Sequence, residues 1–154
     1  MKNNWKLKVL VVFLFFTGNY CLAQRVSENF KQTFSYQQGE QIDIRNIYGK
    51  IAVSHWEKDS VSIVVNVLAK GKNKEVAEKN YNRIKIDLKK EGKIISGITQ
   101  VQGSMVKNLI TSADDYTIDY ELFLPTTSNL SITLRKGEFL AEKLDCKTKL
   151  DITD

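Results

Sequence analysis

The sequence predicts an all-β protein of stacked strand repeats, resembling a β-solenoid or a β-sandwich, with one short helix inserted. Three observations lead to this fold class. A strand pattern occurs twice at a constant spacing, apolar and polar residues alternate along most of the chain, and a helical pattern occurs at one place. Alternation with a period of two is typical of strands that bury one face. We therefore expect residues 24–154 to form a single β-rich domain.

The repeated pattern is a strand, a glycine turn and a second strand. Its first copy contains Ile42, Ile44, Gly49, Ile51 and Val53. Its second copy, 88 residues further on, contains Leu130, Ile132, Gly137, Phe139 and Ala141. Each copy reads as one coil, which cannot bury its apolar face alone and needs a neighbour. The pattern predicts that the two glycines hold equivalent turns with positive φ, where a Cβ would clash.

Both copies extend beyond this common part. Trp56 in the first copy matches Leu144 in the second, which predicts a packing role for the tryptophan. After a slip of one residue, Val61-Ser62-Ile63 matches Leu150-Asp151-Ile152. This match predicts an equivalent third strand in each copy.

The remaining elements follow from local patterns. Phe34 and Tyr36 fit a strand that a polar turn at residues 37–40 closes, and residues 61–67 are the most β-branched strand of the chain. Asn73 is the expected N-cap of the helix, whose apolar face carries Ala77, Tyr81 and Ile84.

A hairpin is expected after the helix, with strands at residues 84–88 and 94–101 and a turn at residues 89–93. Residues 102–115 show no clear period. Residues 116–124 then alternate, with Ile118, Tyr120, Leu122 and Leu124 facing inward. Pro125, which has no N–H to donate, ends this strand.

Residues 1–23 have the composition of a secretory signal peptide. Lys2, Lys6 and Lys8 precede an apolar run at residues 9–16, and Cys21-Leu22-Ala23 forms a small-x-small cleavage site. The apolar run is far shorter than the roughly 20 residues that span a bilayer, so an uncleaved anchor is the weaker alternative. The sequence predicts export.

Cleavage would change the charge of the protein and its cysteine content. Three of the 23 basic residues lie in the leader, so 20 basic residues would remain against 18 acidic ones, a net charge of +2. This small charge gives no support to nucleic acid as a partner. Only Cys146 would remain of the two cysteines, which excludes an intrachain disulfide.

Three stretches together resemble a known family. They are Ile42-x-Ile44-x-Asn46-x-Tyr48-Gly49-x-Ile51-x-Val53-x-x-Trp56, Tyr120-x-Leu122-x-Leu124-Pro125, and Leu130-x-Ile132 followed by Gly137-x-Phe139. They resemble the exported β-strand-repeat proteins of Gram-negative bacteria, a group of adhesin-like heads and domains of unknown function. The resemblance covers residues 42–154 and implies stacked right-handed β-coils. Family members continue through further glycine-marked coils, so the resemblance implies that this chain is truncated at its C-terminus.

Neither the residues nor the resemblance predicts a catalytic, metal or cofactor site. His55, the single histidine, precedes Trp56 at the edge of a repeat, which favours a surface or packing role over catalysis. Cys146 has no histidine near it in the sequence and is expected to be unreactive. Asp114, Asp115 and Asp119 lack calcium-loop spacing and read as solvated acids. We therefore expect a protein that is not an enzyme and that holds no metal and no cofactor.

Two features suggest partners. Lys70, Lys72 and Lys74 and, in the next turn, Lys89, Lys90 and Lys93 are expected to lie together, where they could meet cell-surface polysaccharide; two solvated turns are the simpler reading. Residues 149–154 read as a strand with one apolar face and an unpaired edge, which predicts self-association or the binding of a partner strand.

The sequence thus predicts a non-enzymatic envelope protein that acts as an adhesin-like or interaction module. An accessory or sensor domain of an envelope stress-signalling system, with a sigma and an anti-sigma factor, is the alternative function. The polysaccharide or an envelope protein would be its partner.

Overall fold

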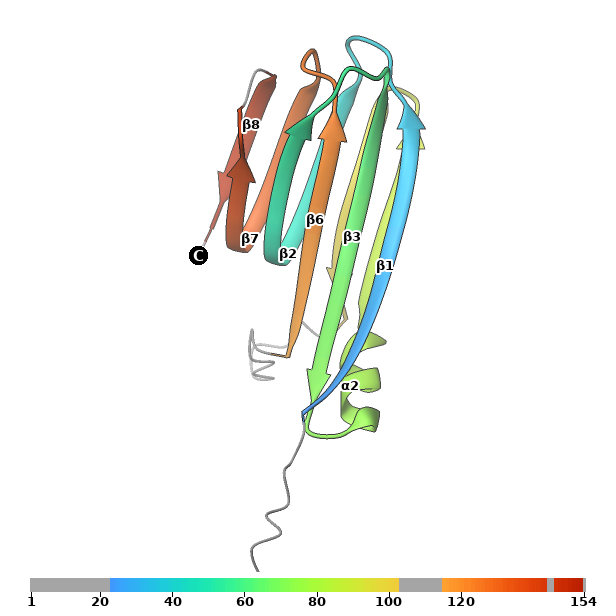
Figure 1. The fold of residues 1–154 in the computed structure, drawn as a ribbon, viewed down its shortest axis with the longest axis vertical. Helices are drawn as coiled ribbons and strands as arrows, with labels where there is room; N and C mark the ends of the chain where they lie inside the picture. The colour runs from blue at the N-terminus through green and yellow to red at the C-terminus, as the bar shows by residue number, and fades with distance from the viewer. Residues whose placement is uncertain (1–22, 103–114, 144–145, 154) are drawn as a thin grey trace, which may run out of the picture.

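The structure is a computed structural model, and it describes residues 23–102, 115–143 and 146–153 (Figure 1). Within these ranges one mixed sheet of eight strands accompanies one helix. In chain order these elements are β1 (Gln24–Ser35), β2 (Gln41–His55), β3 (Ser60–Gly71), α2 (Lys74–Tyr81), β4 (Ile84–Glu91), β5 (Ile94–Val101), β6 (Tyr116–Leu124), β7 (Asn129–Ala141) and β8 (Lys147–Ile152). The all-β class with one short helix is confirmed.

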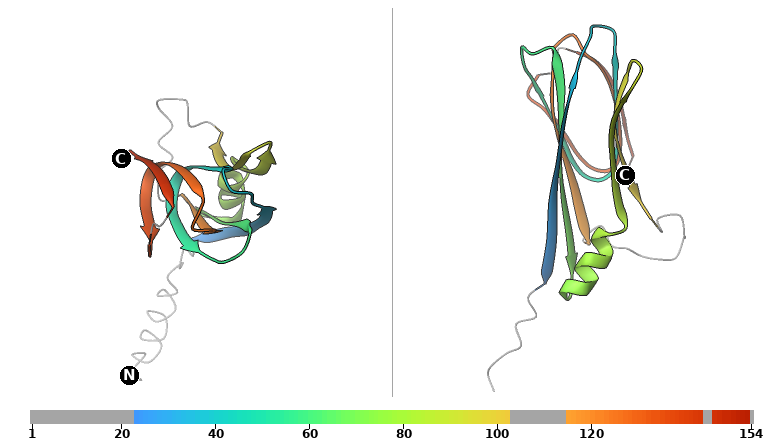
Figure 2. Two further views of the ribbon diagram at one scale, coloured as in Figure 1. Left: turned by 90° about the horizontal axis from the view of Figure 1, so that it is seen from above. Right: turned by 90° about the vertical axis from the view of Figure 1, so that its right-hand side faces the viewer.

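The sheet bends over itself into two layers because β2 and β7 each belong to both (Figure 1). The first half of β2, residues 41–46, pairs with β5 and with the first half of β7. Its second half, residues 51–55, pairs with β6, which continues to β3 and β1. Seen from above, the two layers face each other across the core (Figure 2).

Gly49 and Gly137 lie at these bends and are register partners of each other. Their φ angles are 119° and 145°, values that side-chain-bearing residues rarely adopt. A Cβ on Gly49 would lie 2.3 Å from the carbonyl oxygen of Ile118, and one on Gly137 would lie 1.7 Å from that of Gly49. The predicted equivalence of the two glycines and their positive φ are confirmed. The bends interrupt neither β2 nor β7, which remain continuous strands.

Two polar side chains hold the bend of β2. The amide Nδ2 of Asn46, which is buried, donates to the carbonyl oxygen of Ile118 at 2.7 Å. The Lys50 N–H donates to the Asp119 carboxylate at 2.8 Å. These bonds satisfy backbone groups that the bend takes out of the regular ladder.

The repeat is confirmed for its first two parts and is wrong for the third. β7 lies parallel to β2 in the register that the spacing predicts, with Ile42 beside Leu130 and Ile51 beside Phe139. However, β3 runs antiparallel to both of its neighbours, whereas β8 runs parallel to β7. β8 lies beside β7 in the same way that β7 lies beside β2, so β8 is the counterpart of β7 and not of β3. Apolar alternation is the same in parallel and antiparallel strands, so the pattern could not separate these two arrangements.

The core fills the space between the two layers. Isoleucine, valine and leucine side chains from both layers are fully buried in it, together with one polar pair. The hydroxyls of Tyr120 and Thr99 lie 2.8 Å apart and satisfy each other. The inward positions predicted on β6 are all buried, and Pro125 directly follows its last residue, as expected.

The helix and the hairpin are also as predicted, with small shifts of their bounds. Asn73 is the N-cap of α2 and accepts a hydrogen bond from the Val76 N–H at 2.9 Å. Ala77 is buried and Tyr81 packs against the core, whereas Ile84 already begins β4. β4 extends three residues into the expected turn, which is reduced to residues 92 and 93, and β5 begins and ends as predicted.

Parts of the sequence predictions concern residues outside the described ones. These are the signal peptide apart from residue 23, the segment 103–114 and the position of Leu144. Within the described ranges, no helix combines the length and the apolar composition that crossing a membrane requires.

Candidate functional site

The open end of the two-layer stack is the candidate site. It consists of β8 and of the second half of β7, residues 137–141. β8 pairs with the first half of β7, Asn129 to Leu134, and with no other strand of the described chain. Residues 137–141 pair with β2 on one side only. The stack therefore ends with two strand edges whose outer backbone groups have no described strand beside them.

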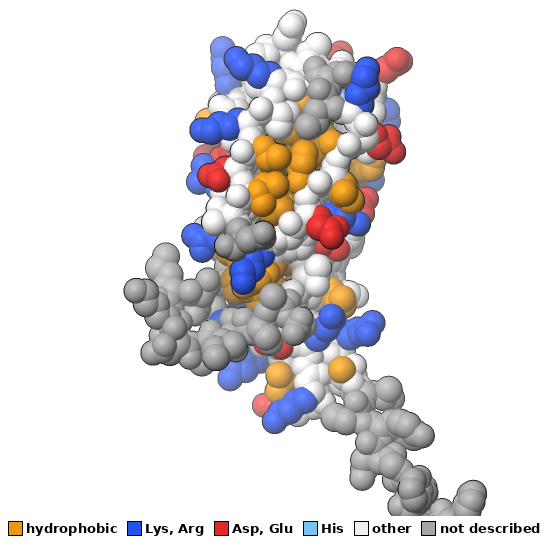
Figure 3. All heavy atoms as spheres, turned by 90° about the vertical axis from the view of Figure 1, so that its left-hand side faces the viewer, with side chains coloured by type: hydrophobic (Ala, Val, Ile, Leu, Met, Phe, Trp, Pro, Cys, Tyr) orange, Lys and Arg blue, Asp and Glu red, His pale blue; other side chains and the backbone are white. Residues whose placement is uncertain are grey.

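The inward row of side chains continues to this end, where nothing in the described chain covers it. Leu150 and Ile152 lie beside Ile132 and Leu134, which are buried. They are nevertheless 43% and 44% exposed. Figure 3 shows an apolar patch on this side of the molecule, bordered by basic and acidic side chains. The apolar face and unpaired edge that the sequence predicted at residues 149–154 are confirmed for residues 149–152.

A second exposed leucine lies on the opposite face of the same edge. Leu140 of β7 is 49% exposed and is the register partner of Ala52, on the outer side of the layer. Phe139, one residue earlier, is the register partner of buried Ile51 and packs against the core. Sequence analysis aligned both residues with the repeat without assigning them to a surface. The pattern did not show which strands lie at the edge of the described sheet.

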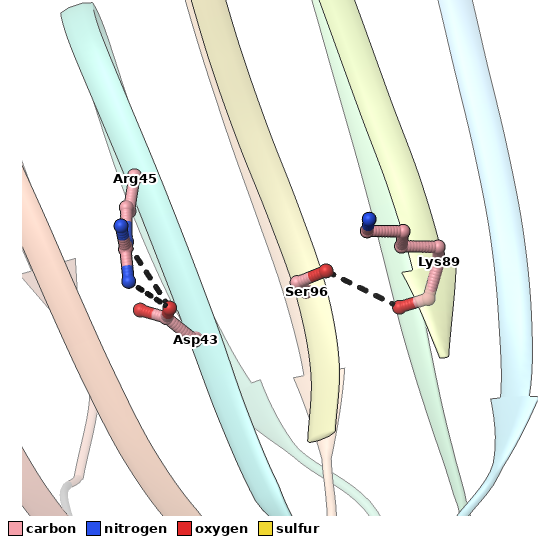
Figure 4. Close-up of polar contacts among 4 residues, drawn as sticks. All are labelled: Asp43, Arg45, Lys89 and Ser96. Carbon is pink, nitrogen blue, oxygen red and sulfur yellow. Dashed lines mark hydrogen bonds and ion pairs between the residues drawn. The ribbon is translucent and has the colours of Figure 1, made fainter. Parts of the chain in front are cut away.

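The outer row of β8 borders a groove that has several charged residues in its lining. The groove has a volume of about 1090 Å³ and lies where β5 parts from β2, whose pairing ends at Arg45 and Ile98. Its charged lining residues are Asp43, Arg45, Arg135, Lys149 and Asp151. Arg45 donates to the Asp43 carboxylate at 2.7 Å, so these two charges largely offset each other (Figure 4). On the adjacent strand the Ser96 hydroxyl donates to the Lys89 carbonyl at 3.5 Å.

His55 is the last residue of β2 and is half-buried. Its Nδ1 lies 3.2 Å from the Leu124 carbonyl oxygen, and its Nε2 is buried with no hydrogen-bond partner in the described chain. A cleft of about 450 Å³ adjoins His55 and is also lined by Trp56. The Trp56 ring is in contact with two other side chains. Lys58 lies 4.8 Å from the centre of the ring, and Phe123 stacks at 5.7 Å. Among the residues that the structure describes, no side chain forms a hydrogen bond with the His55 ring.

The other residues considered for chemistry are dispersed. Cys146 is buried, and its Sγ lies 3.3 Å from the Thr148 hydroxyl. Asp119 supports the bend at Gly49 and is not a solvated loop acid, so that part of the prediction is wrong. Asp114 lies outside the described residues, and the Asp115 carbonyl accepts from the Lys70 N–H. The described part of the chain contains no cluster of three His, Cys, Asp or Glu residues that could hold a metal ion.

The two basic turns lie at opposite ends of the sheet, which contradicts the prediction that they meet. Lys70 is the register partner of Arg25 near the start of β1. Lys90 reaches the other end of β1, where its Nζ donates to the Ser35 carbonyl at 2.8 Å. Ten residues of strand separate these points, roughly 33 Å. The prediction failed because α2 and most of β4 lie between the two lysine groups in the chain, and Lys89 and Lys90 belong to β4 itself.

Sequence analysis also missed an ion pair that joins the two ends of the sheet. Glu40, between β1 and β2, is 6% exposed, and Lys90 of β4 lies 2.7 Å from its carboxylate. The hydrogen bond from Lys90, with another from the Gln37 N–H, holds the pKa of Glu40 below its usual value. A glutamate before a strand and a lysine 50 residues later carry no sequence signal of pairing.

Comparison with known proteins places this fold. No family model matches the chain, and no curated protein matches it. A solved structure named "putative cell adhesion protein" from Clostridium sporogenes is similar, with a TM-score of 0.51 and 14% identity over 82% of this chain and 57% of that one.

Two further solved structures are less similar. A "putative adhesin" from Parabacteroides merdae has a TM-score of 0.39 and 10% identity over 81% of this chain and 44% of that one. A "putative lipid binding protein" from Parabacteroides distasonis has a TM-score of 0.38 and 8% identity over 74% and 41%. The chain spans 57% of the length of the Clostridium protein, and the low identity makes the likeness one of fold alone. This chain therefore has an adhesin-like β fold.

Proposed function

We propose that this protein is a non-enzymatic, exported envelope protein, periplasmic or on the outer surface, that acts as an adhesin-like interaction module through the open end of its stack. One observation carries the proposal: the apolar row of the core reaches a strand edge at which Leu150 and Ile152 are exposed. The fold shared with a protein named for cell adhesion supports it.

The energetics of the open end favour a partner. Complete burial of a leucine or isoleucine side chain contributes roughly 1.5–3 kcal/mol, so covering the exposed two fifths of Leu150 and Ile152 would add about 1 kcal/mol each. An added strand would also pair with backbone groups at the edge, as edge strands of sheets commonly do. Asp151 and the lysines of β8 keep the outer row charged, which favours a limited contact over open aggregation.

Two variants of exposed apolar residues test the proposal. Leu150→Asp places a charge in the apolar row, and Ile94→Asp places the same charge at a similarly exposed position on β5, outside the open end. Beads coated with the purified protein should attach to immobilised bacterial envelope fractions, and Leu150→Asp should lower attachment severalfold. Light scattering of the same variants reports self-association. Ile94→Asp should leave both measurements within about twofold of the unmodified protein, because Ile94 lies outside the open end.

Equal attachment by all three proteins would contradict the proposal. A hydrolase panel provides the second check: an activity that His55→Ala abolishes would show that the protein is an enzyme. The sensor function is not proposed, since no feature of the described residues favours it over adhesion. The polysaccharide is not proposed either, since the two lysine turns that suggested it lie apart.

A further inference from the structure

The cleft beside His55 lies where two turns meet at one end of the sheet. Residues 56–59 form the turn between β2 and β3, and residues 125–128 form the turn between β6 and β7 (Figure 1). Both turns line the cleft, whose volume is about 450 Å³. Ligand pockets commonly measure about 300–1,000 Å³, so this cleft suits a small ligand. Its lining includes no residue of β7 or β8, which makes it separate from the open end.

Hydrogen bonds hold both walls of the cleft in place. The Trp56 backbone N–H donates to the Leu124 carbonyl at 3.1 Å. The indole Nε1 of Trp56 donates to the Ser60 carbonyl at 2.7 Å. In the other turn the Ser128 hydroxyl donates to the Pro125 carbonyl at 2.6 Å. A ligand would therefore meet a ring that is already oriented, which lowers the entropy cost of binding.

The Trp56 ring holds an ammonium group in this structure. Lys58 Nζ lies over the ring, 4.8 Å from its centre. This is within the distance of about 6 Å at which an aromatic ring attracts a cation, and tryptophan is the strongest of the aromatic partners. Among the residues that the structure describes, none forms an ion pair or a hydrogen bond with this ammonium group. The face of Trp56 is therefore a cation site that a side chain of the same turn occupies.

The charge of the cleft also favours a cation. Glu57 and Asp59 flank Lys58 in the lining, and their carboxylates form no ion pair or hydrogen bond with any described residue. With His55 neutral, two carboxylates against one ammonium group leave an excess of one negative charge. This charge attracts a cationic ligand and repels one that carries a carboxylate or a phosphate.

A quaternary ammonium group is suited to displace Lys58 from the ring. The lysine ammonium is strongly hydrated and sits on a flexible stem, so its contact with the ring costs both hydration and side-chain entropy. A quaternary ammonium group has no N–H to hydrate, and aromatic rings commonly recognise it. Lys58 is exposed and can leave the ring without breaking another described interaction of its ammonium group.

We propose that the cleft between these two turns binds an organic cation that has a quaternary ammonium group and no anionic group, as choline does. The ligand would take the face of Trp56 that Lys58 covers in this structure. Lys58 is then an internal competitor, and Glu57 and Asp59 supply the opposing charge. This inference concerns a second site and does not depend on the open end.

Three probes test the chemistry of the site. They are choline, its neutral isostere in which a tert-butyl group replaces the trimethylammonium group, and glycine betaine, which adds a carboxylate. NMR titration of the purified protein follows the indole N–H signal of Trp56 and the amide signals of residues 57–59. Millimolar choline should shift these signals, whereas the neutral isostere should bind at least tenfold more weakly and betaine severalfold more weakly. Absence of shifts with choline, or equal affinity for choline and its isostere, would overturn the proposal.

Variants of Lys58 test the competition without disturbing the fold, because this side chain is exposed. Lys58→Ala frees the ring and should strengthen choline binding severalfold. Lys58→Arg should weaken it, because a guanidinium group stacks well on aromatic faces. Lys31→Ala removes the same charge from an exposed position on β1 and should change the affinity by less than twofold. Unchanged affinity in both Lys58 variants would show that choline does not bind on the ring.

The remaining variants test the ring and the carboxylates. Trp56→Leu should abolish the shifts at residues 57–59, with the other amide signals as the check that the variant is folded. The double variant Glu57→Gln, Asp59→Asn should weaken choline binding severalfold and should remove the preference for choline over betaine. Retention of that preference would overturn the role of the two carboxylates. Leu150→Asp should leave choline binding unchanged and Lys58→Ala should leave bead attachment unchanged, so this inference and the proposed function can fail separately.

Discussion

Individual residues in this protein act mainly by making the bend between the two layers possible. Gly49 and Gly137 allow β2 and β7 to cross from one layer to the other, and Asn46 and Asp119 bind the backbone groups that the bend leaves unpaired. The stability of the fold should therefore depend more on these glycines than on most apolar positions.

Alanine at either bend should be strongly destabilising. At Gly137 the new Cβ would meet a backbone carbonyl at 1.7 Å, in addition to the strain of a positive φ. Strained backbone alone costs roughly 1–3 kcal/mol, so we expect Gly137→Ala to lower the free energy of unfolding by about 3 kcal/mol or more. Gly92→Ala is the matched control, since Gly92 also has a positive φ but no atom lies within 4 Å of its Cβ position. Denaturant unfolding that gave equal losses for both variants would refute the role of the close contact.

Tyr120 should make the protein sensitive to alkaline pH. Burial in the core raises the pKa of its hydroxyl to about 12, against 10.0 for an unperturbed tyrosine. Between these values the unfolded chain loses a proton that the folded chain keeps, so the free energy of unfolding falls as pH rises from 10 to 12. A shift of this size corresponds to roughly 2–3 kcal/mol. Unfolding curves at several pH values should show this fall, and Tyr120→Phe should reduce its slope.

At the scale of elements, one ion pair links strands that share no ladder. Glu40 lies in the β1–β2 connection, and Lys90 of β4 contacts both its carboxylate and the last residue of β1. β1 and β4 are the two ends of the sheet path, so this pair holds together the edges that approach each other (Figure 2).

Acid should weaken this link. The hydrogen bond from Lys90 lowers the pKa of Glu40 below its usual 4.5, so the folded state favours the ionised carboxylate. The resulting stability is present above pH 4.5 and is lost as pH falls through the lower pKa of the folded protein. Glu40→Gln should lower the melting temperature at pH 7 and should reduce its decrease below pH 4.5. An unchanged acid profile in the variant would show that other carboxylates dominate. Glu138→Gln, on the exposed second half of β7, is the control.

At the scale of the whole molecule, the stack has one closed and one open side. β1 and β4 are bridged by Lys90 and flanked by α2, whereas β8 and the second half of β7 end in exposed strand edges (Figure 1). This asymmetry is the main reason to assign interaction to the C-terminal side.

The sequence by itself determined most elements of this protein and one of its tertiary contacts, although β1 begins at Gln24, well before the strand predicted at Phe34 and Tyr36. Period-two alternation defined the strands, Asn73 defined the start of α2, and the spacing between Gly49 and Gly137 gave the register of β2 against β7. Strand alternation depends on which face is buried, and a glycine column depends on a clash that only glycine avoids, so both leave a local trace in the sequence.

Only the tertiary structure decided the rest. It showed that β3 runs antiparallel to its neighbours, whereas β8 runs parallel to β7. It placed the two lysine groups at opposite ends of the sheet and paired Glu40 with Lys90. It also separated Leu140 from Leu150, which are both exposed but lie on opposite faces of the open end. The direction of a strand, the distance between two turns and an ion pair between strands that share no ladder all depend on how segments far apart in the chain pack together. The identity of a residue is the same in either arrangement, so the sequence alone could not distinguish them.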